Sequence, residues 1–519
     1  MKPGHDGTAC LLEDGELKFS FEAEKDSFPR YSAITPSSIT RALQACSKIP
    51  DVWCISGWMN GWHPDEQPIG AGYSGLEIIK ESTSRILGKD IKSFSSTHER
   101  AHILCAYGMS PFPQGTPCFV LVWEGHFGNL YYVDEKVNIH FCERILDCPG
   151  NRYFFLYAIA EPTHPSEIGQ FRFEYAGKLM ALSAFSDRQP PSREEAEIIE
   201  FLLSQDDLLL TTSMNDMKWS PFLDIGVESK EFKNLAGKFS DALFNRFYER
   251  VSVHASPSHP LLISGGCGLN CEWNTRWKDS GLFSSVFVPP CPNDSGAAIG
   301  TAIDAQLHLT GIAKIQWNVY SGAGFEDDLF TTDGYRCEPF SAERTASYLE
   351  KGAVFGVLNG RAELGPRSLG NRSVIAAPFD LSTRDRLNHI KMRENFRPIA
   401  PISLLEGASD HFEIYEPSPH MLYFHRVVNK SLKAVTHIDG TARVQTVTKQ
   451  ENCFMYNILK AFRDKTGCGV LCNTSFNTKN RGFVNRVSDA LLLCKQQDLD
   501  GLVLPDRLII RENIPQPLL

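Results

Sequence analysis

The chain has 519 residues, 42% of them hydrophobic and 22% charged, a balance typical of a globular enzyme with two or three domains. Its net charge of −10, without any run of Lys and Arg, disfavours duplex nucleic acid as a partner. No apolar run approaches the roughly 18 residues of a membrane span, and signal-peptide features are missing, so we expect a cytoplasmic protein without a membrane partner.

Residues 4–24 predict a polar glycine turn, a strand, an Asp-Gly hairpin turn and a second strand. Only Met1, Lys2 and Pro3 precede the first turn. A strand normally precedes a turn of this kind. Because only three residues precede the turn here, we expect that the coding start is clipped.

Strands and helices then alternate, as in an α/β fold. The predicted strands are 118–125, 128–135, 259–266 and 284–290, and the predicted helices are 37–46, 192–205, 231–251 and 295–311.

Turn residues with little periodicity fill the segment from 320 to 341, and we expect a domain boundary there. A second α/β segment follows, with strands at 353–359 and 468–473, a helix at 381–392 and a closing hairpin at 501–512. The expected domains are residues 1–320 and 321–519.

The fifteen cysteines are odd in number, and several lie inside apolar runs such as 116–123 and 468–472. This usage predicts reduced cysteines in the core. The chain contains no Cys-x-x-Cys pair, so a thiolate zinc site has no support.

His98 and His102 are four residues apart at the start of a predicted helix. Side chains at this spacing lie on one face, so both imidazoles can reach one ion. Two partly exposed helix histidines would show the same spacing.

Two carboxylates strengthen the metal hypothesis. Glu124 ends an apolar strand, and Asp294 lies at the N-terminal edge of a helix. Two imidazoles and two carboxylates suit iron(II), manganese or zinc. Asp294 could also be a helix N-cap.

A buried strand ends in Gly265, Gly266 and Gly268, followed by Asn270. Such glycines allow backbone amides to approach a phosphate closely, although a tight turn alone would also use them. Together with the turn at residues 4–8, they suggest the two phosphate loops of an actin-like ATPase core.

The densest pattern is cationic and lies in the C-terminal part. Its Lys and Arg side chains recur beside Gly, Pro and Asn, in segments too irregular for a solvated helix face. These side chains could also form scattered salt bridges on the surface instead of a binding site. Guanidinium groups bind phosphate bidentately, and neutral donors follow in residues 473–475, so a phosphorylated substrate is indicated. The cations are Arg361, Arg367, Arg372, Lys391, Arg393, Arg397 and Arg443.

The chain resembles the O-carbamoyltransferases that modify nodulation factors, cephem antibiotics, aminoglycosides and ansamycins. The resemblance covers nearly the whole chain and rests on motifs in a specific order. They are GHDG (4–7), HERAH (98–102), AGKLMALSA (176–184), SGGCGLN (264–270), PPCPNDSGAAIG (289–300), GRAELGPRSLGNRS (360–373), RENFRPIAP (393–401) and CNTSFN (472–477).

This resemblance implies an actin-like N-terminal domain, similar to the threonylcarbamoyl-transferases of tRNA modification, and a smaller C-terminal domain similar to the partner that makes the adenylate. The C-terminal domain would form carbamoyl adenylate from ATP, with Mg²⁺, and carbamoyl phosphate. The N-terminal domain would transfer the carbamoyl group to the hydroxyl of a small molecule.

By position, the resemblance implies that His98, His102 and Asp294 bind a divalent metal, with iron(II) the first choice. Glu124 stands where the family pattern has Asp, which changes the reach of a fourth ligand. His5 and Asp6 would lie beside the acceptor alcohol, with His5 as the base. The implied carbamoyl-phosphate and adenylate contacts are Arg367, Lys391, Arg397, Arg443, Asn473 and Ser475.

Segments 24–32 and 56–67 are expected to shape the acceptor pocket, because their aromatic residues can stack on a ring. A secondary metabolite or sugar is the first choice of acceptor, and a hydroxymethylated nucleotide is an alternative. Threonylcarbamoylation of tRNA would require a basic surface, and hydrogenase maturation would require cysteine-pair zinc motifs. An actin-like regulatory protein would not need the second, arginine-rich site.

Overall fold

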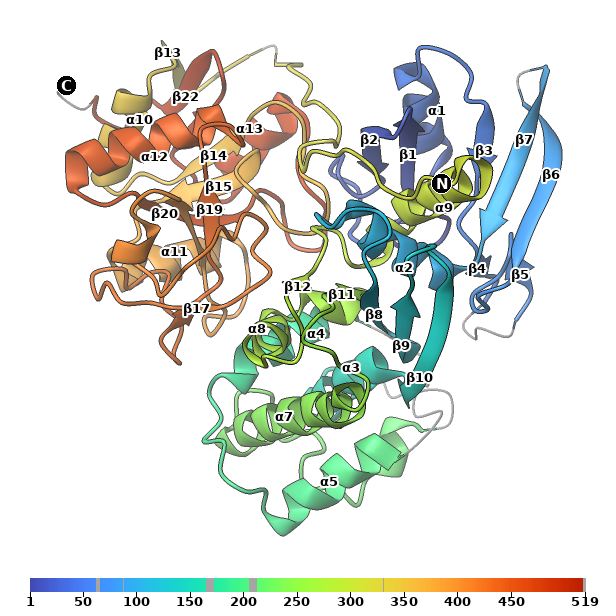
Figure 1. Cartoon of the computed structure of the whole chain (residues 1–519). Helices are drawn as coiled ribbons and strands as arrows, with labels where there is room; N and C mark the ends of the chain where they lie inside the picture. The colour runs from blue at the N-terminus through green and yellow to red at the C-terminus, as the bar shows by residue number, and fades with distance from the viewer. Residues whose placement is uncertain (62–65, 87, 165–171, 205–211, 330, 517–519) are drawn as a thin grey trace. The chain divides into compact units, whose positions relative to one another are not determined.

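The computed structural model describes residues 1–519 except 62–65, 87, 165–171, 205–211, 330 and 517–519 (Figure 1). The chain forms two compact units. The first unit contains residues 1–2 and 50–316, and the second contains residues 3–49 and 317–519.

A five-stranded sheet forms the centre of the first unit. Its order is β10-β9-β8-β11-β12, in which the first three strands are antiparallel and β8, β11 and β12 are parallel. Because parallel strands end at the same edge, the residues that follow β8 and β11 are neighbours. The strands are β8 (Cys118–Trp123), β9 (Phe127–Val133), β10 (Ile139–Asp147), β11 (Leu261–Ser264) and β12 (Val286–Phe287).

Helices α2 (His98–Met109) and α9 (Ala297–Thr310) pack closely against each other. A Cβ atom on Gly300 would lie 1.8 Å from the carbonyl oxygen of Ala101, so the helix backbones meet where only glycine fits. Arg100 on α2 fixes their register through Nε and Nη2, which donate to the buried Asp304 carboxylate on α9 at 2.8 and 2.6 Å.

The other helices of this unit are α3 (Pro149–Ala160), α4 (Glu174–Ser183), α5 (Arg193–Ser204), α7 (Lys230–Ser252) and α8 (Cys271–Asp279). A separate sheet has the order β3-β7-β6, with β3 (Val52–Cys54), β6 (Ile79–Ile86) and β7 (Lys89–Ser96). Strands β4 (Trp58–Met59) and β5 (Pro68–Ile69) form a short pair.

The second unit begins with the predicted hairpin of β1 (Thr8–Glu13) and β2 (Glu16–Glu22). Asp14 and Gly15 have φ angles of 50° and 78°, as a type I′ turn requires. Helix α1 (Pro36–Ala45) follows and is capped by Thr35.

A mostly antiparallel sheet forms the core of the second unit, with the order β13-β22-β21-β14-β15-β20-β16-β19. Neighbouring residues alternate between its two faces, so that Ile375 packs with α10 and α12 while Val374 packs with α11 and α13. The strands are β13 (Tyr335–Pro339), β14 (Phe355–Leu358), β15 (Arg372–Ala376), β16 (Ala400–Leu404), β19 (Gln445–Val447), β20 (Val470–Ser475), β21 (Gly501–Val503) and β22 (Arg507–Arg511), and β17 (His425–Arg426) pairs with β18 (Thr441–Ala442). The helices are α10 (Ala342–Glu350), α11 (Leu381–Ile390), α12 (Cys453–Thr466) and α13 (Val487–Gln496).

The predicted α/β class with two domains is confirmed. Each predicted helix and strand corresponds to an observed one. Several observed elements were not predicted, among them strands β6, β7, β10, β13, β15 and β16 and helices α3, α4, α8, α10, α12 and α13. Residues 3–49 belong with the C-terminal part of the chain rather than with residues 50–316. The functions assigned to residues 1–320 and 321–519 remain predictions.

All fifteen cysteines are free, as predicted, and seven are buried. Cys337 and Cys453 are exposed, so the expectation of core positions holds only in part. Within the described residues, no helix combines the length and apolarity that crossing a membrane requires.

Candidate metal centre and cationic site

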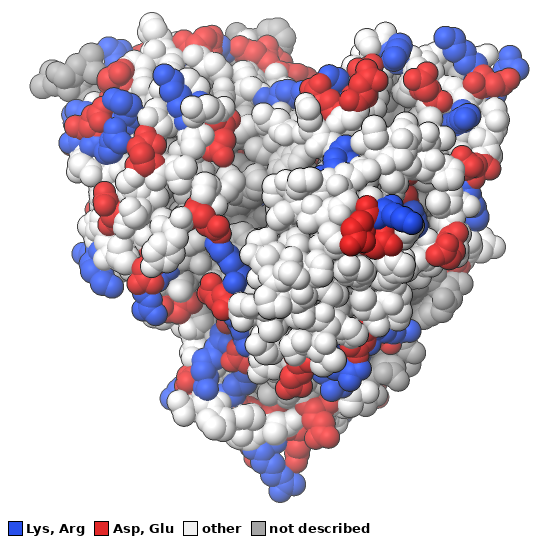
Figure 2. Space-filling view, viewed as in Figure 1, with Lys and Arg blue, Asp and Glu red and all other residues white. Residues whose placement is uncertain are grey.

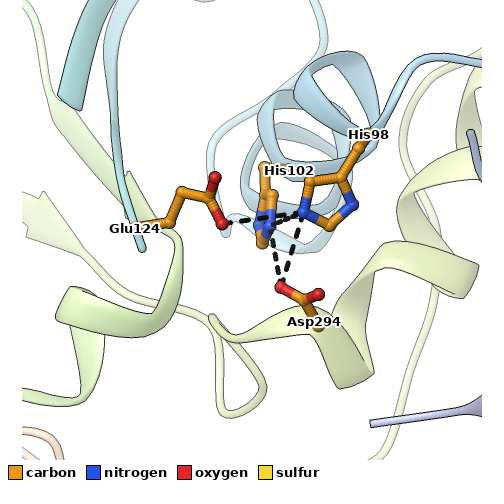
Figure 3. A group of neighbouring side chains, drawn as sticks. All are labelled: His98, His102, Glu124 and Asp294. Atoms are coloured by element: carbon orange, nitrogen blue, oxygen red, sulfur yellow. Dashed lines mark hydrogen bonds and ion pairs between the residues drawn. The ribbon is translucent and has the colours of Figure 1, made fainter. Parts of the chain in front are cut away.

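His98 and His102 lie on the first turns of α2, which Thr97 caps by accepting a hydrogen bond from the backbone N–H of Arg100. Both imidazoles are buried, and their Nε2 atoms are 3.0 Å apart (Figure 3). The predicted helix and its i, i+4 face are therefore observed, and the alternative of two partly exposed histidines is wrong.

Glu124 and Asp294 bring their carboxylates to the same point (Figure 3). Glu124 follows β8, and Asp294 precedes α9. Asp294 Oδ1 is 3.5 Å from His98 Nε2 and 3.4 Å from His102 Nε2, and Glu124 Oε2 is 3.7 Å from His98 Nε2. Asp294 is not the cap of α9, because Gly296 occupies that position.

The donor set suits one transition-metal ion. One ligand atom from each of the four side chains lies within 4.8 Å of the others, and all four side chains are buried. Donors that bind one ion at about 2.1 Å lie about 3.0 to 3.4 Å apart, close to the separations observed here. Buried imidazole and carboxylate ligands suit iron(II), manganese or zinc.

Neighbouring side chains hold these ligands in place. The Tyr73 hydroxyl donates to Glu124 Oε1, and the Tyr73 ring stacks on His98 at 4.7 Å. His102 Nδ1 lies 3.1 Å from the hydroxyl of Ser264, the last residue of β11. Glu124 is one methylene longer than the Asp of the family pattern, and the Tyr73 hydroxyl holds this longer side chain in place. Outer partners of this kind orient metal ligands and tune their basicity.

The carboxylates change the proton affinity of the cluster. Burial alone would lower the pKa of His98, but the charges of Asp294 and Glu124 outweigh burial and raise it to about 9. Burial would raise the pKa of Glu124, yet the hydrogen bond and charge of His98 lower it below its ordinary value. Burial, followed by the Glu124 charge, raises the pKa of Tyr73 well above its ordinary value, so the phenol stays protonated and donates.

Glu99 completes a His-Glu-x-x-His sequence, the pattern of zinc peptidases, in which the glutamate is the general base. Here the Glu99 carboxylate accepts hydrogen bonds from the backbone N–H of Gly75 at 2.6 Å and from the Tyr131 hydroxyl. It anchors α2 to a loop and to β9. The structure therefore does not support a peptidase interpretation of this helix.

Lys2 is a site residue that the sequence pattern did not identify. Its side chain is fully buried, with Nζ 2.8 Å from Asp294 Oδ2 and 3.7 Å from the centre of the Trp58 ring. The same indole packs edge-on against His98 at 4.8 Å. Asp294 thus directs one oxygen to the imidazoles and the other to an ammonium group. A single lysine far from the other residues in sequence gives no local signal of this contact.

We expect Lys2→Met to destabilise the metal-free protein by about 3 kcal/mol, because it leaves the buried Asp294 carboxylate without its ammonium partner. A divalent ion should recover most of this loss, since the cluster becomes more negative by one charge. Denaturant unfolding with a chelator and with added metal measures both effects. The exposed Lys136→Met variant is the control. Equal metal-free stability of Lys2→Met and wild type would contradict the expectation.

The predicted glycine loop lies beside the metal cluster. A Cβ atom on Gly265, which has a φ of 92°, would lie 2.3 Å from the carbonyl oxygen of Trp123. This glycine therefore permits the close approach of the chain after β11 to Glu124. Asn270 caps α8 through Oδ1, and its buried Nδ2 has no hydrogen-bond partner among the described residues. A role of Gly265, Gly266, Gly268 and Asn270 in nucleotide binding remains a prediction.

His5 and Asp6 form a pair with each other. His5 Nδ1 is 3.2 Å from Asp6 Oδ2, and Asp6 has a left-handed φ of 53°. They belong to the second compact unit, whereas the four candidate metal ligands belong to the first. The expected acceptor segment 24–32 also belongs to the second unit. Of segment 56–67, Trp58 packs on His98, and residues 62–65 lie outside the described residues.

Several predicted phosphate contacts gather in the second unit. Burial lowers the pKa of Lys391 well below its ordinary value, and nearby arginines, including Arg393 and Arg397, lower it further. Arg443 lowers the pKa of both Arg393 and Arg397, after burial, and Glu394 is the acidic group that opposes this repulsion. The Arg443 Nε atom is buried without a hydrogen-bond partner among the described residues. The side chains therefore form a cationic site, which we define as Lys391, Arg393, Arg397 and Arg443.

Two other predicted cations have a structural role. Arg361 donates to the carbonyl oxygens of Gly322, Lys18 and Ser321. The fully buried Arg372 donates to four carbonyl oxygens and to Asn485. These hydrogen bonds fix the protein's own backbone, and a role of either arginine in phosphate binding remains a prediction.

The polar strand end lies beside the cationic site. Lys391 Nζ donates to the carbonyl oxygens of Ser475 and Asn477, each at 2.6 Å. Asn473 Nδ2 donates to Ser368, the residue after Arg367, and to Gln445. The predicted phosphate contacts within segments 360–373 and 472–477 are thus adjacent, although their binding roles remain predictions.

On the face shown in Figure 2, basic and acidic side chains are interspersed without a broad basic area. The cationic site is buried or half-buried, so it does not require such a surface. This arrangement suits a small phosphorylated ligand better than a long nucleic acid.

Comparison with known proteins identifies the same two parts of the chain. Residues 73–303 match the model described as carbamoyltransferase N-terminus, and residues 346–511 match carbamoyltransferase C-terminus. The 3'-hydroxymethylcephem-O-carbamoyltransferase of Amycolatopsis lactamdurans is 43% identical over 98% of both chains. That of Streptomyces clavuligerus is 44% identical over 98% of this chain and 97% of its own. Nodulation protein U of Rhizobium tropici is 34% identical over 99% of this chain and 96% of its own.

Proposed function

The chain belongs to the carbamoyltransferase family, and we propose that it uses ATP and carbamoyl phosphate to carbamoylate the hydroxyl group of a small molecule. The second unit would form carbamoyl adenylate, as proposed for residues 321–519, and the metal centre of the first unit would serve the transfer. The cephem enzymes among its relatives suggest a hydroxymethyl group on a ring as the acceptor.

The cationic site carries this proposal. Burial lowers the pKa of Lys391, Arg393 and Arg397, and the positive charges of neighbouring members of the site lower it further. Such a concentration is costly unless an anion binds there, and guanidinium groups match phosphate geometry. The triphosphate of ATP and the phosphate of carbamoyl phosphate are anions of this kind.

The reaction balances with one molecule of water. Carbamoyl phosphate and water give carbamate and phosphate. A carbamate oxygen then bonds to the α-phosphorus of ATP, the bond to the pyrophosphate oxygen breaks, and carbamoyl adenylate remains. The acceptor oxygen finally bonds to the carbamoyl carbon, AMP leaves, and the hydroxyl proton passes to a base. The mixed anhydride with AMP makes the carbamoyl group a better acyl donor than carbamate.

His5 is the proposed base for the acceptor hydroxyl. With its Nδ1 donating to Asp6 Oδ2 at 3.2 Å, the Nε2 atom carries the lone pair that can accept a proton. His98, His102, Glu124 and Asp294 would hold the metal, and a bound divalent ion would act as a Lewis acid for a phosphate or carbonyl oxygen. Tyr73 and Ser264 would keep the ligands oriented.

Release of pyrophosphate from ATP tests the first half-reaction. We expect release that depends on carbamoyl phosphate and is accompanied by an equal amount of phosphate. Mass spectrometry of candidate alcohols then tests transfer, with hydroxymethylcephem, a sugar and a hydroxymethylated nucleoside as the acceptor panel. Without carbamoyl-phosphate-dependent pyrophosphate release, the proposed adenylate mechanism would be wrong.

We expect Arg443→Lys to slow adenylate formation about tenfold or more. Lysine keeps the charge but loses the planar fork, at a cost of roughly 1.5 to 3 kcal/mol for a charge-assisted hydrogen bond to phosphate. Initial rates of pyrophosphate release measure the effect. The exposed Arg426→Lys variant of the same unit is the control. A wild-type rate would assign Arg443 a structural role.

A further inference from the structure

A small polar cavity lies in the second unit, between β2, the segment that follows it, the start of α1 and residues 322–323. Its volume is about 30 Å³, enough for about two water molecules or for one polar group of a ligand. Acidic, basic, hydroxyl and phenyl side chains line it, and its lining residues are distinct from those of the cationic site.

Two oxygen atoms of the cavity lining have no hydrogen-bond partner among the described residues. One is the buried Oγ atom of Ser20, a residue that is only 2% exposed. The other is Asp26 Oδ1, which is also buried, whereas Oδ2 of the same carboxylate accepts a hydrogen bond from Arg486 Nη2 at 3.4 Å. A buried oxygen without a partner costs free energy, so native proteins normally supply water or a ligand at such a position.

Lys25 and Glu22, which also line the cavity, are already paired. Lys25 Nζ donates to Glu22 Oε1 at 3.0 Å and to the carbonyl oxygen of Gly365 at 2.6 Å, and Gly365 N–H donates to Glu22 Oε1 at 2.7 Å. The remaining hydrogen-bonding capacity therefore belongs to Ser20 and Asp26. An ionised carboxylate oxygen only accepts hydrogen bonds, so the occupant must offer an N–H or O–H group.

The turn that carries His5 and Asp6 is fixed to two walls of this cavity. Ala23 N–H, in the cavity wall, donates to the carbonyl oxygen of Gly7 at 2.8 Å, and Gly7 N–H donates to that of Ser32 at 2.8 Å. A Cβ atom on Gly7 would lie 2.0 Å from the backbone nitrogen of Ile34, on the segment that leads into α1. The cavity thus lies in the same part of the second unit as the proposed base.

We propose that this cavity recognises the acceptor alcohol by binding an amino, amide or hydroxyl group other than the hydroxyl that is carbamoylated. ATP and carbamoyl phosphate carry phosphate groups that the Asp26 carboxylate repels, so the acceptor is the substrate that suits the cavity. The inference rests on the proposed function. It adds hydrogen bonding by Asp26 and Ser20 to the aromatic stacking that the sequence predicts for segment 24–32.

Glu326 provides a matched control for Asp26. Arg41 and Arg486 lie 3.2 and 3.0 Å from the Glu326 carboxylate and 3.7 and 3.4 Å from the Asp26 carboxylate. Glu326 is not a lining residue of the cavity. Glu326→Gln therefore disturbs the same two arginines but leaves both cavity oxygens in place, so it reports a purely structural effect of the ion pairs.

The test compares Ser20→Ala, Asp26→Asn and Glu326→Gln in the full chain. The probes are a 3'-hydroxymethylcephem with a free amide N–H and its N-methylated derivative. Calorimetry measures their binding, and carbamoyl transfer gives KM and kcat. We expect Ser20→Ala and Asp26→Asn to weaken binding of the N–H probe about tenfold and to raise its KM, with a smaller change in kcat and in the KM for ATP. The N-methylated probe should be insensitive to both variants, and Glu326→Gln should bind as wild type does.

Unchanged affinity for the N–H probe in both cavity variants would overturn the inference, even if pyrophosphate release supports the proposed reaction. Equal weakening by Glu326→Gln would also overturn it, because the effect would then come from the ion pairs. If acceptor binding depends on Ser20 and Asp26 but the wild type releases no pyrophosphate with carbamoyl phosphate, the binding site stands and the proposed reaction fails. If the wild type modifies the sugar or the nucleoside of the acceptor panel instead, the same variants are measured with that acceptor.

Discussion

Replacing His98 and His102 together by alanine should abolish carbamoyl transfer, with a loss of about a thousandfold or more, while pyrophosphate release continues at nearly the wild-type rate. Both imidazoles point at the same position as Asp294 Oδ1, so the variant loses two of four candidate metal ligands. Loss of a Lewis acid removes several kcal/mol of transition-state stabilisation. The cationic site lies in the other compact unit.

Metal content, carbamoylated product and pyrophosphate are measured on the same sample. Retained pyrophosphate release shows in addition that the second unit is folded. The exposed His140→Ala variant of the first unit is the control and should keep both activities. Parallel loss of both activities in the double variant, with the protein still folded, would contradict the division of labour between the two sites.

The candidate metal ligands could be predicted because each of them has a local signal. The i, i+4 spacing of His98 and His102 places both on one helix face, and Glu124 and Asp294 flank apolar strands or helices that set their direction. The cluster then forms because α2 and α9 pack through Gly300 and the Arg100–Asp304 pair.

The positions of Lys2 and Tyr73 could not be predicted, because their contacts join residues that are distant in sequence. Lys2 reaches Asp294 across most of the first unit's sequence, and Tyr73 reaches Glu124 from a segment without periodicity. Residues 27–30 likewise pair through their main chain with residues 480–483, and no side-chain pattern reveals such pairing. Buried long-range polar contacts of this kind follow from the tertiary fold.

Arg361 and Arg372 show a second limit of prediction from the sequence, because residues of the same type and setting can have different contacts. Arg361, Arg372 and Arg397 have the same sequence character, since all occur beside Gly, Pro or Asn. Only the fold reveals that Arg361 and Arg372 use their donors on carbonyl oxygens, whereas Arg397 lies among like charges. Residue type and spacing identified the cationic region but not which of its members bind the protein's own carbonyl oxygens.

A variant of Arg397 tests the cationic site, as the double histidine variant tests the metal centre. Arg397→Ala should reduce pyrophosphate release about a hundredfold or more, because a half-buried guanidinium that contacts phosphate contributes roughly 3 kcal/mol. Metal binding should be unchanged, since His98 and its partners lie in the first unit. The partly exposed Arg384, which pairs with Asp385, provides the control variant Arg384→Ala.

Supplying the intermediate separates a catalytic loss from a structural one. If Arg397 serves adenylate formation alone, the Arg397→Ala protein should carbamoylate an acceptor at the wild-type rate when it receives synthetic carbamoyl adenylate, whereas the protein without both imidazoles should not. Each variant then lacks the half-reaction that the other retains.

A mixture of the two proteins should form product slowly. Carbamoyl adenylate must first leave one chain and reach another, and water can hydrolyse it on the way. Failure of added adenylate to restore transfer in Arg397→Ala, with the metal still bound, would show that Arg397 also acts in the transfer step and would refute its restriction to adenylate formation.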